Sequence, residues 1–191
     1  MWKTKNYQLK GVSPVIMSNG MLANPGYIYT KELKKYLSKT KKTEEDAEMI
    51  SQIEYYGGLY MDIDTTTPCI PALVIEATFT NGAKKTKCGM LAKMGMFIEK
   101  NMILKYDGPT SREELYKDER FVDRRMVVVN KKSRVLRTRP IFQEWGGMVE
   151  VSYDTDVVDV SKLDDWVRAA GSYVGFCEMR PKYGRFIVVE E

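Results

Sequence analysis

Histidine is missing from the chain of 191 residues. This side chain carries out most acid–base chemistry near neutral pH and is the commonest ligand of transition metals. Its absence excludes Ser–His–Asp triads, Cys–His pairs and ribonucleases that act through histidine. An enzyme built from this sequence would need carboxylates that hold a hard metal ion, or lysine and tyrosine. We therefore predict that the protein is not an enzyme and that it needs no cofactor.

Cysteine is scarce as well, with three residues (Cys69, Cys88 and Cys177) and no C-x-x-C pair. This pattern argues against a disulfide framework and a zinc knuckle, so we expect the cysteines to be small buried hydrophobic residues. The P-loop and the G-x-G-x-x-G motif are absent. No apolar run has the length of a signal-peptide core or a membrane span, which predicts a soluble cytoplasmic protein without a membrane partner.

The charge is uneven along a chain of ordinary globular composition, which is 43% hydrophobic and 29% charged. From Glu150 onward there are nine acidic and five basic residues, whereas the preceding part has 25 basic and 17 acidic residues. A basic body suggests an anionic partner for one face. The alternative is a mixed, solvated surface without a specific partner.

Hydrophobic periodicity and turn residues predict alternating strands and helices. Strands are expected at 2–17, 59–64, 96–106, 121–129, 133–142, 147–154 and 183–189, and helices at 30–42, 43–58, 71–83, 111–119 and 161–171. The strands at 121–129 and 133–142 flank a short Asn-Lys-Lys turn and predict a hairpin. The order of elements predicts an α+β fold, a ferredoxin-like or RRM-like antiparallel sheet with helices on one face. We expect one domain over residues 1–191, with a helical insertion at about 27–57.

Three basic clusters are candidate binding sites for phosphate groups. In the hairpin, Arg137 and Arg139 share a strand face, and arginine presents forked donors that suit phosphate oxygens. A lysine cluster follows the central helix, and a basic, glycine-containing loop precedes the last strand, where glycine permits close approach of a ligand. The hairpin residues are Arg124, Arg125, Arg134, Arg137 and Arg139, with Lys131 and Lys132 in the turn; the others are Lys84, Lys85, Lys87, Arg180, Lys182, Gly184 and Arg185.

Each cluster also has a purely structural interpretation. The hairpin arginines could pair with Glu113, Glu114, Glu119 and Asp123 on an exposed sheet face. Lysines at a helix end interact favourably with the helix dipole, and the last loop could simply lead into a strand.

Acidic and aromatic residues provide two further candidate sites. Asp62 and Asp64 would share one strand face, so they could hold a hard metal ion for a nuclease. The alternative, which we favour, is the solvent face of an edge strand. Tyrosines at 27, 29, 55, 56 and 60 could stack on bases, although such residues more often cover sheets and helices.

Three blocks together resemble a known family: "LKGVSPVIMSNG", "TPCIPALVIEATFTNGAKK" and "AAGSYVGFCEMRPKYGRFIVV". They are similar to the RAMP superfamily, the RRM-like proteins that form the guide-RNA-binding backbone of CRISPR effector complexes. The whole also looks like stand-alone RAMP-like proteins of phages and mobile elements. The resemblance implies binding of RNA or single-stranded DNA, without catalysis, through a sheet face and the last loop. Of the two we favour RNA, and we expect the protein to assemble along the strand.

The same resemblance leaves a second function open. The chain could be an anti-defence protein that mimics a RAMP subunit and binds a host CRISPR complex as an inhibitor or scaffold. Its working face would then be the acidic C-terminal third, and its location the cytoplasm of a bacterial host cell.

Overall fold

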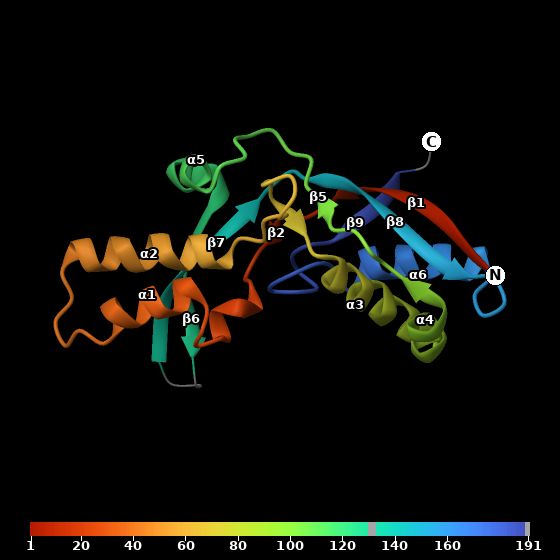
Figure 1. The fold of residues 1–191 in the computed structure, drawn as a ribbon, viewed down its shortest axis with the longest axis horizontal. Coiled ribbons are helices and arrows are strands. Elements are labelled where there is room, and N and C mark those ends of the chain that lie inside the picture. Colours follow the sequence, from red (N-terminus) through yellow and green to blue (C-terminus); the bar gives the residue numbers. More distant parts are fainter. Residues whose placement is uncertain (130–132, 190–191) are drawn as a thin grey trace. The chain divides into compact units, whose positions relative to one another are not determined.

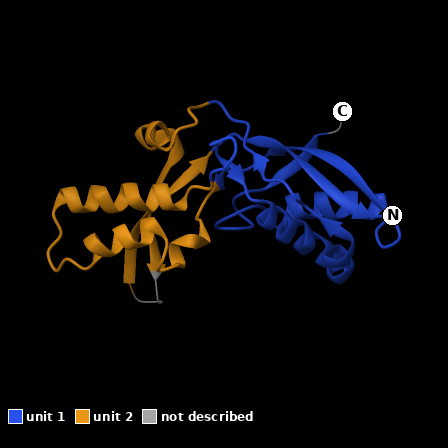
Figure 2. Cartoon of the chain, viewed as in Figure 1, with its two compact units in different colours: residues 1–15, 61–107, 143–191 blue, residues 16–60, 108–142 orange. Residues whose placement is uncertain are grey.

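The computed structural model describes residues 1–129 and 133–189 and has an α+β fold (Figure 1). The chain forms two compact units, each built from separate stretches of sequence (Figure 2). Unit 1 comprises residues 1–15, 61–107 and 143–191, and unit 2 comprises residues 16–60 and 108–142. Within the described ranges, no helix combines the length and the apolar composition that crossing a membrane requires.

Unit 1 contains an antiparallel sheet with the strand order β4-β8-β1-β9. Its strands are β1 (Trp2–Gly11), β4 (Met96–Phe97), β8 (Gly146–Asp154) and β9 (Phe186–Val189). Helix α3 (Ala72–Ala83) connects β1 to β4, and helix α6 (Val160–Tyr173) connects β8 to β9. The chain order is therefore β-α-β-β-α-β, the ferredoxin-like arrangement. The predicted fold class is confirmed.

Both helices cover the same face of this sheet. Tyr7 and Leu9 of β1 are buried on that face, and the Tyr7 hydroxyl donates a hydrogen bond to Asp164 of α6. Phe79 of α3 contacts the ring of Phe186 in β9. The opposite face is open and exposes Phe97, Met148 and Ile187.

Smaller elements complete unit 1. A 3-10 turn, η2 (Lys84–Thr86), separates α3 from α4 (Gly89–Gly95), and β3 (Cys69–Ile70) pairs with β5 (Met102–Ile103). The expectation of buried cysteines holds for Cys69, whose burial raises the pKa of its thiol to about 12. The other two cysteines are half-buried, and all three are free.

Unit 2 combines a hairpin with helices. Its sheet has the order β2-β7-β6, with β2 (Val15–Ile16), β6 (Val122–Val129) and β7 (Ser133–Phe142). Its helical elements are η1 (Gly20–Ala23), α1 (Ile28–Leu37), α2 (Glu44–Gly58), α5 (Arg112–Lys117) and η3 (Glu119–Phe121). The predicted hairpin is confirmed by the antiparallel pairing of β6 and β7. The single domain with an insertion at about 27–57 stays a prediction.

Local sequence signals explain why α2 begins and ends where it does. The Thr43 hydroxyl accepts from the Asp46 backbone N–H, and the Asp46 carboxylate accepts from the Thr43 N–H, a reciprocal capping box. At the other end, Gly57 and Gly58 are the last two residues of α2. A Cβ on Gly57 would lie 2.6 Å from Leu22, so glycine lets η1 pack against α2.

Candidate nucleic-acid interface

The pairing register divides the hairpin arginines between two faces. Residues directly opposite each other in an antiparallel pair point to the same face. Arg125 lies opposite Arg137 and Asp123 opposite Arg139, so these side chains share one face. The pairs Arg124–Thr138 and Val128–Arg134 occupy the other face. The predicted common face of Arg137 and Arg139 is confirmed, but the five arginines do not form a single surface.

Three of these arginines form ion pairs with carboxylates of unit 2. Arg124 binds Glu119 at 2.6 Å and lies over the ring of Tyr116. Arg125 pairs with Asp123, its neighbour on the same strand face. Arg137 pairs with Glu54 of α2. The structure therefore shows these three arginines in ion pairs with acidic residues, the alternative to phosphate binding that the sequence left open. Glu54 was not among the expected partners.

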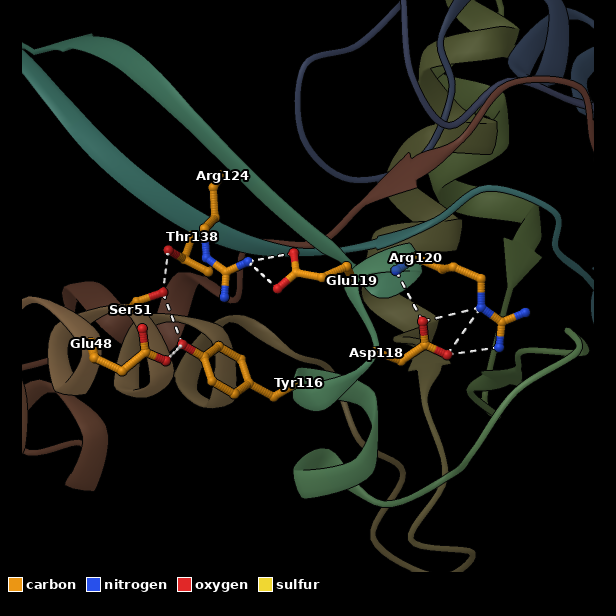
Figure 3. Close-up of polar contacts among 8 residues, drawn as sticks. All are labelled: Glu48, Ser51, Tyr116, Asp118, Glu119, Arg120, Arg124 and Thr138. Carbon is orange, nitrogen blue, oxygen red and sulfur yellow. Dashed lines mark hydrogen bonds and ion pairs between the residues drawn. The ribbon is translucent and has the colours of Figure 1, made fainter.

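A buried polar network attaches the hairpin to α2 and α5 (Figure 3). The hydroxyls of Ser51 and Thr138 share a hydrogen bond of 2.8 Å. The Tyr116 hydroxyl lies 3.0 Å from Ser51 Oγ and donates to Glu48 over 2.5 Å. Burial, and then the hydrogen bond to Glu48, raise the pKa of Tyr116. The network fixes the position of β7 against α2 through directional contacts.

The outer half of the hairpin presents a different surface, which we call the distal hairpin face. It consists of Met126, Val128, Arg134 and Leu136, whose pairing places them together. Met126, Val128 and Leu136 are 58%, 63% and 50% exposed. Arg134 is exposed and forms no ion pair with any residue that the structure describes. Lys131 and Lys132 lie outside the described residues.

Arg139 borders a groove of about 480 Å³ in unit 2. We call it the β7 groove; its lining includes Leu22, Leu33, Lys34, Leu37, Glu54 and Arg139. Neither Arg139 nor Lys34 has a carboxylate partner among the described residues. Arg139 and Arg134 therefore belong to separate surfaces on opposite faces of the hairpin.

The lysine cluster of unit 1 lies at the C-terminal end of α3, near the C-terminal end of α6. Lys84 and Lys85 lie in η2, and Lys87 follows in a left-handed conformation. Lys85 Nζ is 5.0 Å from the ring centroid of Tyr173, the last residue of α6. All three lysines are exposed, so they could contact an anion.

The last loop of unit 1 exposes Arg180, Lys182 and Arg185, whereas Gly184 is buried. Gly184 has a φ of +72°, its N–H donates to the Pro14 carbonyl, and a Cβ there would lie 2.1 Å from the Phe176 carbonyl oxygen. The close approach that this glycine permits is thus to the protein's own backbone. The loop's contact with nucleic acid stays a prediction, as does a continuous track joining it to the hairpin.

The predicted strand face of Asp62 and Asp64 is wrong. Met61 forms only an isolated bridge with Pro68, and the residues after it form a turn. Asp62 accepts hydrogen bonds from the backbone of Asp64 and Thr65 and from the Asn101 side chain, which lower its pKa, Asn101 most strongly. Within residues 1–129 and 133–189, no cluster of three or more potential metal ligands is found. Asp62 therefore organises a turn, and the lack of enzymatic activity stays a prediction.

The tyrosines near residues 27–60 pack mainly against one another. Tyr27, Tyr29, Tyr55 and Tyr56 form edge-to-face ring contacts that extend to Tyr116, with centroids 5.2 to 6.4 Å apart. This arrangement is typical of rings that cover a core.

The sequence did not identify Ser51, Glu54 and Tyr116 as important, because isolated polar residues on a helix usually face solvent. One sequence signal could have identified Glu54: it is a charged residue between two large hydrophobic residues, Ile53 and Tyr55, both of which are buried.

No family model matches the chain, and no curated protein matches it. Among solved structures, it matches the crystal structure of Cmr6 from Pyrococcus furiosus with a TM-score of 0.42 and 12% identity, over 99% of both chains. A similarity this weak does not assign the chain to a family.

Proposed function

We propose that the chain binds single-stranded nucleic acid, RNA rather than DNA, through the distal hairpin face. The observation that carries the proposal is the combination of an unneutralised cation, Arg134, with three exposed apolar side chains on one face of a hairpin. Arginine can bind phosphate oxygens, while exposed aliphatic side chains such as Met126 and Leu136 can pack against unstacked bases. A double helix hides the faces of its bases, so such a surface suits a single strand.

The distribution of charge also favours unit 2 as the part of the chain that binds nucleic acid. Unit 2 has 16 Lys and Arg against 11 Asp and Glu, a net charge of +5. Unit 1 has 14 against 15, a net charge of −1. The positive charge of the chain therefore resides in the unit that carries the hairpin, where it would attract a polyanion.

The remaining basic residues have different expected roles. Arg124, Arg125 and Arg137 are already paired with carboxylates of unit 2, so we expect them to contribute mainly to stability. Lys84, Lys85, Lys87, Arg180, Lys182 and Arg185 belong to unit 1, and their contact with phosphate groups stays an expectation from the sequence. The choice of RNA, the assembly along it and a phage or mobile-element origin rest on the sequence resemblance alone.

Fluorescence anisotropy with labelled oligouridylate, oligothymidylate and duplex RNA tests the proposal. Binding to the single strands should weaken steeply between about 50 and 200 mM salt, since bound counterions are released. Arg134→Ala should reduce the slope of log K against log salt by about one. Leu136→Ser should weaken binding without changing that slope. The matched control is Arg120→Ala, an exposed arginine of unit 2 outside the hairpin, paired with Asp118.

Two results would contradict the proposal: no binding of any single strand at low salt, or a salt slope that Arg134→Ala leaves unchanged. The alternative function, an inhibitor or scaffold that binds a CRISPR-type protein complex, predicts co-purification with a protein partner that survives nuclease and high salt. The absorbance ratio of the purified protein at 260 and 280 nm, before and after nuclease treatment, separates the two.

A further inference from the structure

The β7 groove is lined in part by a strand, β7, of which one edge is only partly paired. β2 has two residues, and after it the Met17 N–H donates to the Pro140 carbonyl at 2.9 Å. The chain then leaves the sheet for η1 and α1. In this sheet β7 is the central strand, yet its neighbour on one side covers only the end near Phe142. Among the described residues, no strand covers the rest of that edge.

The direction of the backbone groups on this edge follows from the pairing. In an antiparallel strand, the N–H and C=O of one residue point to the same side, and successive residues alternate. The Thr138 N–H and the Pro140 carbonyl both point to the β2 side. The Thr138 carbonyl and both backbone groups of Leu136 therefore point to that side too, where a further strand could pair with them.

A side chain already takes the place of a strand at one point of this edge. Glu54 is only 5% exposed, and its carboxylate accepts from the Thr138 N–H at 3.0 Å and from Arg137. A buried carboxylate here satisfies the donor that a neighbouring strand's carbonyl would otherwise bind. Charged side chains at an edge also discourage unspecific pairing with other strands.

The chemistry of the groove indicates the kind of segment that would fit. Leu22, Leu33 and Leu37 provide apolar walls, and Lys34 and Arg139 provide positive charge. The carboxylate in the lining, Glu54, is already bonded to Arg137 and Thr138. An occupant with apolar groups and negative charge would therefore find both complements in the groove.

We propose that the β7 groove binds an extended segment of a partner protein in which apolar residues alternate with Asp or Glu, added as a strand beside β7. Strand addition provides main-chain hydrogen bonds, and alternate side chains enter pockets on one face. The apolar residues would contact the leucines, and the carboxylates would pair with Arg139 and Lys34. A nucleic acid offers no alternating N–H and C=O groups for the edge, which is why a peptide fits better. This site differs from the proposed nucleic-acid surface, because Arg134 points to the other face of the hairpin.

A designed peptide tests the proposal with the full-length protein. The probe is fluorescein-labelled Gly-Val-Glu-Val-Glu-Val-Glu-Gly amide, with two comparison peptides: one with Lys in place of each Glu, and one with Pro in place of the central Val. We expect saturable binding of the acidic peptide by anisotropy, and at least about tenfold weaker binding of both comparison peptides. Hydrogen-exchange mass spectrometry should show protection of the segment 133–142 on binding.

Variants locate the binding site. Arg139→Glu and Leu37→Gln should each weaken peptide binding by about tenfold or more, since one reverses the charge and the other removes an apolar wall. The control for Leu37 is Ile28→Gln, which removes an exposed apolar residue of the same helix that does not line the groove. The control for Arg139 is Arg134→Ala, which should weaken oligonucleotide binding and leave the peptide unaffected.

Several results would overturn the proposal. Equal affinity for the acidic and basic peptides, or binding that Arg139→Glu does not change, would show that the groove does not select this chemistry. Displacement of the peptide by oligouridylate in the Arg134→Ala variant would assign the groove to nucleic acid. Concentration-dependent dimerisation abolished by Leu37→Gln would assign it to a second copy of the chain.

Discussion

The two units hold their elements in place by different interactions. In unit 1, the helices meet the sheet through large apolar side chains, with Phe79, Phe176 and Phe186 in ring contact and Trp166 fully buried. Among the described residues, five polar or charged side chains are buried in unit 2 and two in unit 1. Those of unit 2 are Asp46, Ser51, Glu54, Asp123 and Thr138. Apolar packing depends on shape and volume, whereas the buried polar contacts that unit 2 adds to its own apolar core depend on direction and charge.

This difference bears on function. A hairpin held by buried hydroxyls and carboxylates has a specified orientation, because a misplaced partner would leave a buried polar group without a hydrogen bond. The buried polar residues of unit 2 thus help to fix the position of β7, and both proposed binding surfaces include residues of that strand. The following substitutions test whether the two units respond as this contrast predicts.

The largest effect should come from Gly82→Ala in unit 1. A Cβ at this position would lie 2.3 Å from the Trp166 carbonyl oxygen and 2.8 Å from the Ala170 nitrogen, both backbone atoms of α6. Backbone atoms cannot rotate away, so α3 and α6 must separate, and we expect a loss of about 3 kcal/mol. Urea denaturation measures it. Gly89→Ala is the control, because its Cβ would meet only the flexible Lys84 side chain. An equal loss in both variants would contradict the role assigned to close packing.

The second effect should appear in unit 2 with Glu54→Ala. This change removes the carboxylate that binds Arg137 and the Thr138 N–H, so two donors lose their partner. We expect a loss of about 2–3 kcal/mol in unfolding free energy. Glu119→Ala breaks the ion pair of Arg124 with a glutamate that is 74% exposed, and should cost less than about 1 kcal/mol. Comparable losses would show that the buried carboxylate has no special part in unit 2.

Local signals in the sequence predicted much of the fold. The Asn-Lys-Lys signal between 121–129 and 133–142 predicted the hairpin, and hydrophobic periodicity predicted a helix at 161–171, where the structure has α6. Thr43 and the paired glycines bounded α2 within a residue of its observed ends. These features depend on neighbours a few residues apart, which is why the sequence contains them.

The candidate site could be predicted only in part. Glu54 and Arg137 are 83 residues apart, and Tyr116 and Ser51 are 65 apart, so no local pattern links them. Strand alternation correctly put Arg137 and Arg139 on one face, but the distribution of the other arginines depends on the pairing register, which the turn alone did not give. Asp62 was misplaced because "MDID" alternates like a strand while its carboxylate organises a turn.

A third and smaller effect should follow Thr43→Ala. The variant loses the hydroxyl that accepts from the Asp46 N–H at the start of α2. We expect a loss of about 1 kcal/mol, typical of an N-cap. If polar contacts hold unit 2 together, hydrogen exchange should accelerate in α2 and in the β7 segment that contacts it, and not in α6. Thr40→Ala, an exposed change before the helix, is the control. If hydrogen exchange accelerated equally in both units of the variant, the loss of this cap would not be confined to unit 2, and the contrast between the units would be wrong.

The smallest effect concerns Asp164, a polar contact within the mainly apolar unit 1. Burial alone would raise the pKa of this carboxyl, but hydrogen bonds from Lys5 at 2.5 Å and Tyr7 at 2.7 Å outweigh it and hold the pKa below its usual value. A depressed pKa stabilises the fold fully above the unfolded value of about 4, and this stabilisation is lost as pH falls through the folded pKa.

Asp164→Asn should therefore be less stable than the parent protein at neutral pH, by less than about 1 kcal/mol. The difference should shrink below about pH 4, as the parent's Asp164 becomes protonated. Urea denaturation at several pH values measures it, with the exposed neighbour Asp165→Asn as control. A difference that stays constant down to acid pH would mean that the charge of Asp164 contributes nothing, and that unit 1 depends on packing alone.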